Sequence, residues 1–299
     1  MKMNKRRISL ANKTYTWKFS VLAMILYIIL FIYPSILSIY LSMTDWSVTK
    51  WDYEFVGLKH FQEIFTKSNH LKYIGRTCWF AFVTSIAKAI VGLALALALN
   101  SKYLKSKNVL RAIFFMPNII SPLIIGIIFQ SIFHPTGIIN GFLDAIGLGM
   151  LKHAWLTDVD LAFNTVMVVE VWRYAGFNMV VFLAGLQMID TNYYEAAEID
   201  GANAWQRFRH ITVPCLMPSI TINTVLNVMS GLKVFDLIFT MTKGGPGDIT
   251  DVLNTVIFQE YSKGRYGFST ALGVVLFVIT AVIAFAIYIP LSKKEIDGE

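Results

Sequence analysis

Charge is the scarcest property of this sequence. Asp, Glu, Lys and Arg make up 15% of its 299 residues, whereas 56% are apolar. A typical soluble domain carries about 25% charged residues, and a water-exposed surface needs at least that share. This shortage argues against a disordered chain and against a soluble enzyme. The composition therefore predicts a protein that crosses a membrane several times.

Cysteine is also scarce, with only Cys78 and Cys215 in the chain. Both lie at the edges of apolar segments, far apart in the sequence, and they form neither a CxxC pair nor a metal-binding spacing. The low count excludes a small secreted domain held together by disulfides. We expect both cysteines to be buried as small apolar side chains.

The motifs of common catalytic sites are missing. The sequence has no GxxxxGKS or GxxxxGKT phosphate loop, no HExxH, and no cluster of His and Cys that fits zinc. Its five histidines are scattered over loops, and the glycine-rich stretch 243–247 predicts a turn. We therefore expect a chain that is not an enzyme and binds no cofactor, which favours a transport or scaffold role.

Long apolar runs are what the sequence does contain. A helix needs about 20 apolar residues to cross a bilayer, and six runs reach that length. They lie at approximately 20–42, 77–99, 110–133, 161–187, 213–240 and 268–291. The predicted fold class is an all-α polytopic membrane protein with six transmembrane helices.

Basic residues indicate the orientation of these spans. The net charge is +7, and six basic residues precede the first run, with no signal-peptide cleavage site after it. If that segment is cytoplasmic, both termini are, and inside segments hold 14 basic residues against 9 outside. The excess of basic residues then reflects the orientation of the spans in a lipid bilayer and does not indicate a nucleic-acid site. The predicted segments are a cytoplasmic tail 1–19, a first span with outer loop 20–76, a five-span core 77–291 containing the loop 190–214, and a cytoplasmic tail 292–299.

The loop between the fourth and fifth spans is the most specific feature. Asn192 with Glu195, and Asn203 with Gln206, have the spacing of helix-capping boxes. Gly201 lies between the two pairs, where glycine can end a helix in the left-handed conformation. The pattern predicts two short helices joined by a tight turn.

The second of these helices is predicted to be amphipathic. Trp205, Phe208 and Ile211 follow one side of it, and Pro214 is expected to end it and begin the next span. An exposed apolar side on a short helix requires a groove on a partner. The loop therefore predicts a docking element at the cytoplasmic surface.

This loop resembles the EAA motif of ABC importer permeases, which reads EAA, three residues, G, nine residues, I, any residue, LP. The residues that match at this spacing are Glu195, Ala196, Ala197, Gly201, Ile211 and Pro214. Val213 stands where the motif has Leu, which is a conservative change. Further stretches resemble the maltose-type, carbohydrate-carrying branch, so that the resemblance covers nearly the whole chain. They lie at 55–58, 137–140, 184–187 and 243–247.

The resemblance implies a type I, MetI-like importer core and one of two membrane subunits of a bacterial sugar importer. Such permeases pair with a second homologous permease, two copies of a cytoplasmic ATPase and an extracytoplasmic solute-binding protein. ATP and Mg bind to the ATPase, not to the permease. The loop helix acts as a coupling helix in a cleft of the ATPase, whose closure opens the pathway outward.

The resemblance also implies roles for residues of the loop. Glu195 would pair with a basic group of the ATPase, the two alanines would allow close approach, and Asp200 would cap the second helix or bind the ATPase. Trp205 and Phe208 are the expected anchors because aromatic side chains dominate interface energetics. A self-packed hairpin without a partner is the alternative. The full predicted coupling set is Glu195, Ala196, Ala197, Asp200, Gly201, Trp205, Phe208, Ile211 and Pro214.

Five charged residues fall within the predicted spans: Lys88, Glu170, Arg173, Lys233 and Asp236. An unpaired charge at the centre of a span costs at least about 2.5–3.5 kcal/mol. Glu170 with Arg173, and Lys233 with Asp236, are three residues apart, so each pair is expected to meet on one helix face. Lys88 is expected to face a neighbouring helix or a cavity. Internal pairing and a role in gating or substrate contact both remain open.

A polar stripe marks the fifth predicted span. Asn223, Asn227 and Ser230 fall within an arc of about 60° and should face the bundle interior. They either form interhelical hydrogen bonds or line a sugar path together with Lys233 and Asp236.

The predicted function is translocation of a carbohydrate across the plasma membrane, driven by a partner ATPase. A phosphorylated polyol such as glycerol 3-phosphate is the alternative substrate, and it would need an unpaired basic residue such as Arg173 or Lys233. An integral-membrane enzyme is disfavoured by the missing catalytic groups. An ion-coupled carrier or a passive channel is disfavoured because neither needs a cytoplasmic docking helix.

Overall fold

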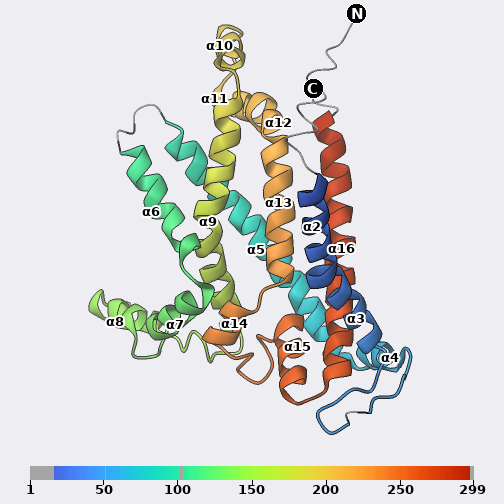
Figure 1. The fold of residues 1–299 in the computed structure, drawn as a ribbon. Coiled ribbons are helices and arrows are strands. Elements are labelled where there is room, and N and C mark those ends of the chain that lie inside the picture. The colour runs from blue at the N-terminus through green and yellow to red at the C-terminus, as the bar shows by residue number, and fades with distance from the viewer. Residues whose placement is uncertain (1–16, 51, 102–103, 105, 297–299) are drawn as a thin grey trace, which may run out of the picture. The chain divides into compact units, whose positions relative to one another are not determined.

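The computed structural model describes residues 17–50, 52–101, 104 and 106–296 (Figure 1). Within these residues the ordered elements are helices, joined by loops that hold two isolated β-bridges. The all-α class is therefore confirmed. Two compact units share the chain: residues up to 64 with 260–274 form one, and residues 65–259 with 275 onward form the other.

The first unit combines the N-terminal helical segment with part of the C-terminal region. Its elements are α2 (Trp17–Tyr27), η1 (Ile28–Ile32), α3 (Tyr33–Leu41), most of α4 (Lys59–Thr66), the end of α15 (Leu253–Ser262) and the start of α16 (Tyr266–Ile296). The loop after α3 packs on the start of α16, where the rings of Trp46 and Tyr266 lie 4.8 Å apart. Arg265 forms ion pairs with Glu63 and Glu260 in the same unit.

The second unit is a bundle built around one long helix, α9. Its elements are α5 (Ser68–Leu99), α6 (Lys107–Ile119), α7 (Pro122–Ile132), α8 (Ile138–Ala145), η2 (Gly149–Leu151), α9 (Ala162–Met188), α10 (Thr191–Ile199), α11 (Ala204–Arg207), η3 (Phe208–Thr212), α12 (Val213–Cys215), α13 (Met217–Leu232) and α14 (Asp236–Met241), with parts of α15 and α16. Helix α9 packs against α5, α6 and α13 (Figure 1). Gly176 lets it approach the backbone of α6 at Phe114, as small residues do at helix contacts in membranes.

Among the described residues, four helices are long and apolar enough to cross a bilayer unbroken. They run over Ser20–Leu41, Asn69–Leu99, Ala162–Met188 and Tyr266–Lys293. Two further helix pairs qualify together but are bent, and they raise the number to six if each pair is one span. Of the predicted tails, residues 1–16 and 297–299 lie outside the described part of the chain.

The third and fifth predicted spans are not straight helices. Helices α6 and α7 meet at 97°, and the segment that ends in α12 meets α13 at 68°. At the first bend Ile120 and Ser121 are extended immediately before Pro122, because a proline disfavours helical geometry in the residue that precedes it. The prediction of one helix over 213–240 is also wrong at its other end, since α13 stops at Leu232.

Two π-helical segments precede two further prolines. In η1 the N–H of Tyr33 bonds to the carbonyl of Ile28 just before Pro34, and in η3 the N–H of Val213 bonds to Phe208 just before Pro214. Proline lacks an N–H, and its ring collides with the carbonyl four residues earlier. A wider turn relieves that collision, so the helix continues through each proline.

The two cysteines differ in burial. Cys78 is partly buried, whereas Cys215 is exposed, so the expectation that both are buried is wrong. Cys215 is the last residue of α12 and borders the bend at Leu216, where the chain leaves one helix axis for another.

Candidate functional site

The loop between α9 and α13 folds into a helical hairpin, which we call the loop hairpin (residues 190–215). The N-cap of its first helix, α10, lies two residues before the predicted cap. Asp190 is the N-cap, and its carboxylate accepts a hydrogen bond from the N–H of Asn192 at 3.0 Å. The predicted capping role of Asn192 is therefore wrong. Asp190 takes that role because it directly follows extended Ile189 at the end of α9.

The turn of the loop hairpin is made as the sequence predicts. Gly201 has φ +76°, in the left-handed region, and its N–H donates to the carbonyl of Glu198. The N–H of Ala202 donates to Ala197 at 2.8 Å, which satisfies a carbonyl at the end of α10. Asp200 is the C-cap of α10 and does not cap the second helix.

The second helix starts with the predicted capping box. Asn203 accepts from the N–H of Gln206 at 2.9 Å, and the Gln206 side chain accepts from the N–H of Asn203 at 2.8 Å. The helical run then continues through η3 and α12 and passes Pro214. The prediction that Pro214 ends this helix is therefore wrong, and the bend comes at Leu216 because the π-turn accommodates the proline.

Side chains across the loop hairpin hold its two arms together. Tyr194 and Thr212 share a hydrogen bond of 3.0 Å between hydroxyl groups. Arg207 forms an ion pair with Glu198, with 3.4 Å between Nη1 and Oε2. The EAA motif did not predict these contacts, although the sequence has the acidic Glu198 in α10 and the basic Arg207 in α11.

The outer surface of the loop hairpin includes large exposed apolar side chains. Trp205 is 66% exposed and stacks on Phe208, with 5.5 Å between ring centroids. Ile199, on the other arm, is 88% exposed and was missed by the sequence reasoning. Burial divides the predicted coupling set: Glu195, Ala196, Asp200, Gly201, Trp205 and Pro214 are exposed, and Ala197, Phe208 and Ile211 are half-buried.

The charged residues of the spans meet in one buried cluster. Glu170 on α9 accepts from Lys88 on α5 through one oxygen at 2.9 Å and from Arg173 through the other at 2.9 Å. Lys88 is 0% exposed and Glu170 is 1% exposed. The predicted Glu170–Arg173 pair is confirmed, as is the prediction that Lys88 faces a neighbouring helix. Both cations also lie 4.2 Å from the centroid of the Tyr174 ring.

The polar stripe of α13 faces α9 and α5. Asn227 and Asn178 exchange two amide hydrogen bonds of 2.6 and 3.2 Å. Ser230 donates to the carbonyl of Asn227 and lies 3.4 Å from the amine of Lys88. We call the continuous set Lys88, Glu170, Arg173, Asn178, Asn227 and Ser230 the buried polar seam.

Asn223 differs from the rest of the stripe. It lies one turn before Asn227 and is 0% exposed, yet neither atom of its amide has a hydrogen-bond partner within the described residues. A buried amide without partners is costly, and such groups call for an explanation. Asn223 therefore marks an unsatisfied polar point inside the bundle.

Lys233 and Asp236 do not form the predicted pair on one helix face. Lys233 follows the last residue of α13, and Asp236 begins α14. Lys233 is exposed, and its carbonyl accepts from Asn254. The prediction was wrong because α13 ends at Leu232, before both residues.

Comparisons with known proteins cover most of the chain. Residues 88–292 match the family model described as "Binding-protein-dependent transport system inner membrane component". The "Multiple sugar-binding transport system permease protein MsmF" of Streptococcus mutans is 31% identical over 95% of this chain and 97% of its own length. The "Trehalose/maltose transport system permease protein MalF" of Thermococcus litoralis is 33% identical over 81% of both chains.

A solved structure extends the likeness to the fold. It is a chain from a bacterial ABC transporter "involved in the import of the acidic polysaccharide alginate", with 26% identity, a TM-score of 0.80 and coverage of 96% of this chain and 99% of the other. The type I, MetI-like fold is therefore confirmed. The chain belongs to the family of binding-protein-dependent transport system inner membrane components: it is a permease of an ABC transporter, not an enzyme.

Proposed function

We propose that this chain is the membrane-spanning subunit of an ATP-driven importer that carries a sugar or oligosaccharide across the plasma membrane by alternating access. The loop hairpin supports this proposal most directly. Its backbone is capped locally, yet it exposes Trp205 and Ile199 to solvent. Exposed apolar anchors on a rigid element are typical of a binding surface. Relatives named for multiple sugars, for trehalose and maltose, and for alginate support a carbohydrate as cargo.

The partners we propose are a second homologous permease, two copies of a cytoplasmic ATPase, and an extracytoplasmic solute-binding protein. ATP and Mg would bind to the ATPase, and this chain would bind neither. The exposed carboxylate of Glu195 would face a basic group on the ATPase, and the stacked pair Trp205–Phe208 would enter its cleft. Gly201 would keep the two arms of the loop hairpin at a fixed angle as the ATPases close.

The loop hairpin also supports the proposed orientation. An ATPase that hydrolyses cellular ATP lies in the cytoplasm, so its docking element must lie there too. If each bent helix pair is one span, six spans place both termini on the side of the loop hairpin. The six basic residues before the first span agree with this arrangement.

For the sugar path we propose the interior surface of α13. The amide of Asn223 has no hydrogen-bond partner among the described residues, and it can donate to and accept from sugar hydroxyls once the helices part. Asn227 and Ser230 are already bonded inside the bundle, so they contribute to the path only in a conformation that breaks those bonds. Lys233 and Asp236 lie past the end of α13. We propose that they lie near the entrance of the sugar path.

The phosphorylated polyol receives less support. That alternative needed an unpaired cation in the path, and Arg173 is bonded to Glu170 through two of its nitrogens. Lys233 is exposed at the end of its helix. A carbohydrate is therefore the better proposal.

Reconstitution tests the function. The assembled transporter in proteoliposomes is given binding protein with maltotriose, raffinose, cellotriose, an alginate trisaccharide or glycerol 3-phosphate, and ATP hydrolysis and uptake are measured. We expect one saccharide to stimulate hydrolysis and to accumulate inside. Stimulation by glycerol 3-phosphate alone would replace the carbohydrate with the anionic alternative. Uptake that persists without ATPase would contradict the proposal.

A further inference from the structure

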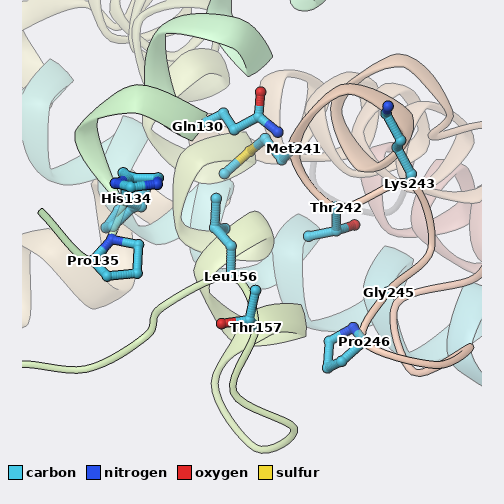
Figure 2. Close-up of a pocket in the computed structure, with 11 residues that line it drawn as sticks. Gln130, His134, Pro135, Leu156, Thr157, Met241, Thr242, Lys243, Gly245 and Pro246 are labelled. Atoms are coloured by element: carbon cyan, nitrogen blue, oxygen red, sulfur yellow. The ribbon is translucent and has the colours of Figure 1, made fainter. Parts of the chain in front are cut away.

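A cavity of about 320 Å³ lies at the end of the second unit opposite the loop hairpin. Its lining comes from the end of α7, from the loop before α9, and from the segment that follows α14. Figure 2 shows His134 and Pro246 on opposite sides of the cavity, with Leu156 between them and Met241 beside Gln130. This size is at the lower end of the range for small-molecule sites.

Two walls of the cavity are fixed by close packing and by a buried amide. A side chain at Gly126 of α7 would collide with Thr240 of α14, so these helices approach as closely as the backbone allows. Buried Asn140 donates to the carbonyls of Pro135 and His153, at 3.0 and 2.9 Å. The cavity therefore does not depend on mobile side chains for its shape.

The third wall is held by a chain of hydroxyl groups. Thr242 and Thr250 lie 2.7 Å apart through their Oγ1 atoms, and Thr250 donates to the carbonyl of Gly245 at 2.8 Å. Between them Lys243 has φ +54°, a left-handed conformation that is uncommon outside glycine. Such strain persists where the surrounding structure imposes it, often at ligand sites.

The chemistry of the lining is that of a sugar site. Phe133 and Met241 are buried and form an apolar floor. The side chains of Gln130 and Lys243 reach the rim and have no hydrogen-bond partner in the part of the chain that the structure describes. The ring of His134 uses Nδ1 for Thr136, which leaves Nε2 for a ligand. An apolar floor suits the C–H face of a sugar ring, and the amide, imidazole and amine suit its hydroxyls.

We propose that this cavity is an outward-facing subsite that holds one ring of the saccharide after the binding protein releases it. The inference rests on the proposed function, because it requires both a sugar cargo and a cytoplasmic loop hairpin. The subsite adds a contact with the sugar outside the interior of the spans, separate from the contact proposed for Asn223. The subsite acts after capture by the binding protein, so its loss lowers the maximal uptake rate and leaves the half-saturating sugar concentration unchanged.

Methyl NMR on the assembled transporter in nanodiscs tests direct binding. The ε-methyl group of Met241, assigned with Met241→Leu, is followed during titration with maltotriose, raffinose, cellotriose and an alginate trisaccharide. We expect one of these sugars to shift the signal, and sorbitol, which has hydroxyls but no ring, to leave it in place. Gln130→Ala and Lys243→Ala should each raise the sugar concentration that gives half of the full shift about three- to tenfold, through loss of a hydrogen bond. Gln62→Ala, at an exposed residue on α4, should not change that concentration.

Uptake kinetics distinguish the possible outcomes. We expect Gln130→Ala to lower the maximal rate about threefold or more without raising the half-saturating sugar concentration. If one of the sugars is taken up but none shifts Met241, the subsite is wrong and the proposed function stands. A rise in the half-saturating concentration of binding protein, with no sugar-dependent shift, would make the cavity a docking pocket for that protein instead. If none of the four sugars is taken up, the proposed function fails, and the subsite fails with it.

Discussion

The loop hairpin and the buried polar seam are both polar regions in an apolar protein, and they satisfy their polar groups in opposite ways. In the loop hairpin the partners are neighbours in the sequence, as with Asn203 and Gln206. In the seam they are distant, as with Lys88 and Glu170, which are 82 positions apart. The loop hairpin can therefore form locally, whereas the seam exists only after the helices have assembled.

The two regions also differ in what a lost partner costs. The Glu198–Arg207 pair of the loop hairpin is in contact with water, with the Glu198 side chain 73% exposed, and such pairs are worth about 0–1 kcal/mol. Glu170 is 1% exposed and neutralises two cations. Breaking a buried pair leaves an uncompensated charge. The comparison teaches that the seam fixes how the helices assemble, whereas the loop hairpin is free to serve a partner.

Glu170→Gln should have the largest effect on stability. The variant keeps the shape of the side chain but leaves Lys88 and Arg173 without a counter-charge, at a cost of about 3–5 kcal/mol. The midpoint of denaturant unfolding of the detergent-solubilised permease measures this loss. Glu198→Gln is the matched control and should change the midpoint little, since the exposed pair is worth at most about 1 kcal/mol.

A second substitution sharpens this test. Lys88→Met in the Glu170→Gln background removes one of the two stranded cations and should recover part of the lost stability. Equal effects of Glu170→Gln and Glu198→Gln would remove the energetic distinction between the seam and the loop hairpin.

Gly201→Asp should abolish transport while leaving the permease in the membrane. A Cβ at Gly201 meets nothing within 4 Å, so the cost is backbone strain of about 1–2 kcal/mol, with a new carboxylate near Glu198 and Asp200. Uptake should fall more than about tenfold, which corresponds to only about 1.4 kcal/mol of lost coupling. Uptake and the amount of permease in membranes are the two measurements.

The control for this variant is Gly201→Asn. Asparagine has the same shape as aspartate, tolerates the left-handed conformation, and adds no charge, so it should retain much of the uptake. Normal uptake by Gly201→Asp would contradict the coupling role of the loop hairpin.

Asn227→Ala should cost about 1–3 kcal/mol, because it leaves the buried amide of Asn178 without its partner. Asn203→Ala removes a cap in the loop hairpin and should cost about 1 kcal/mol, confined to that hairpin. Unfolding midpoints compare the two, and uptake of the saccharides shows whether substrate preference changes. If Asn227→Ala lowers stability but leaves uptake and preference unchanged, the path interpretation of that residue loses its main support.

The sequence predicted the local features best, for a physical reason. The Asn203–Gln206 box and the left-handed Gly201 depend only on nearby residues, and both are confirmed. Asp190 displaced Asn192 as a cap because the end of α9 decides where the next helix begins. The pairing of Glu170 with Arg173 was visible as a spacing of three, but its bond to Lys88 was not, since no spacing rule links α5 to α9.

Breaks in helices were the second kind of feature that the sequence did not predict. Hydropathy does not register a bend, so the angles at Ser121 and Leu216 could not be predicted from apolar runs, although Pro122 and Pro218 follow these bends in the sequence. The pair Lys233–Asp236 failed for the same reason, since its spacing assumed a continuous helix. The cavity was also hidden, because it joins loop segments about 100 positions apart.

Asp251 combines features of the two compared regions, and it yields the smallest expected effect. It is buried like the seam, but its partners Thr255 and Gln259 are near in sequence, as in the loop hairpin. Burial raises the pKa of Asp251 above its ordinary value, the hydrogen bonds from Thr255 and Gln259 lower it in part, and the charge of Asp248 adds to the rise.

The raised pKa fixes the sign of a pH dependence. The folded protein binds the proton of Asp251 more tightly than the unfolded chain does, so this group adds stability as the pH falls through the raised pKa and loses it as the pH rises. Compared with the unchanged protein, Asp251→Asn should therefore lower the thermal midpoint at about pH 4 more than at about pH 7, and Asp160→Asn, at an exposed site, should not. If instead the midpoint of Asp251→Asn at about pH 4 rises relative to that at about pH 7, the local hydrogen bonds of Asp251 outweigh its burial. Nearness in sequence, and not exposure, would then separate the loop hairpin from the seam.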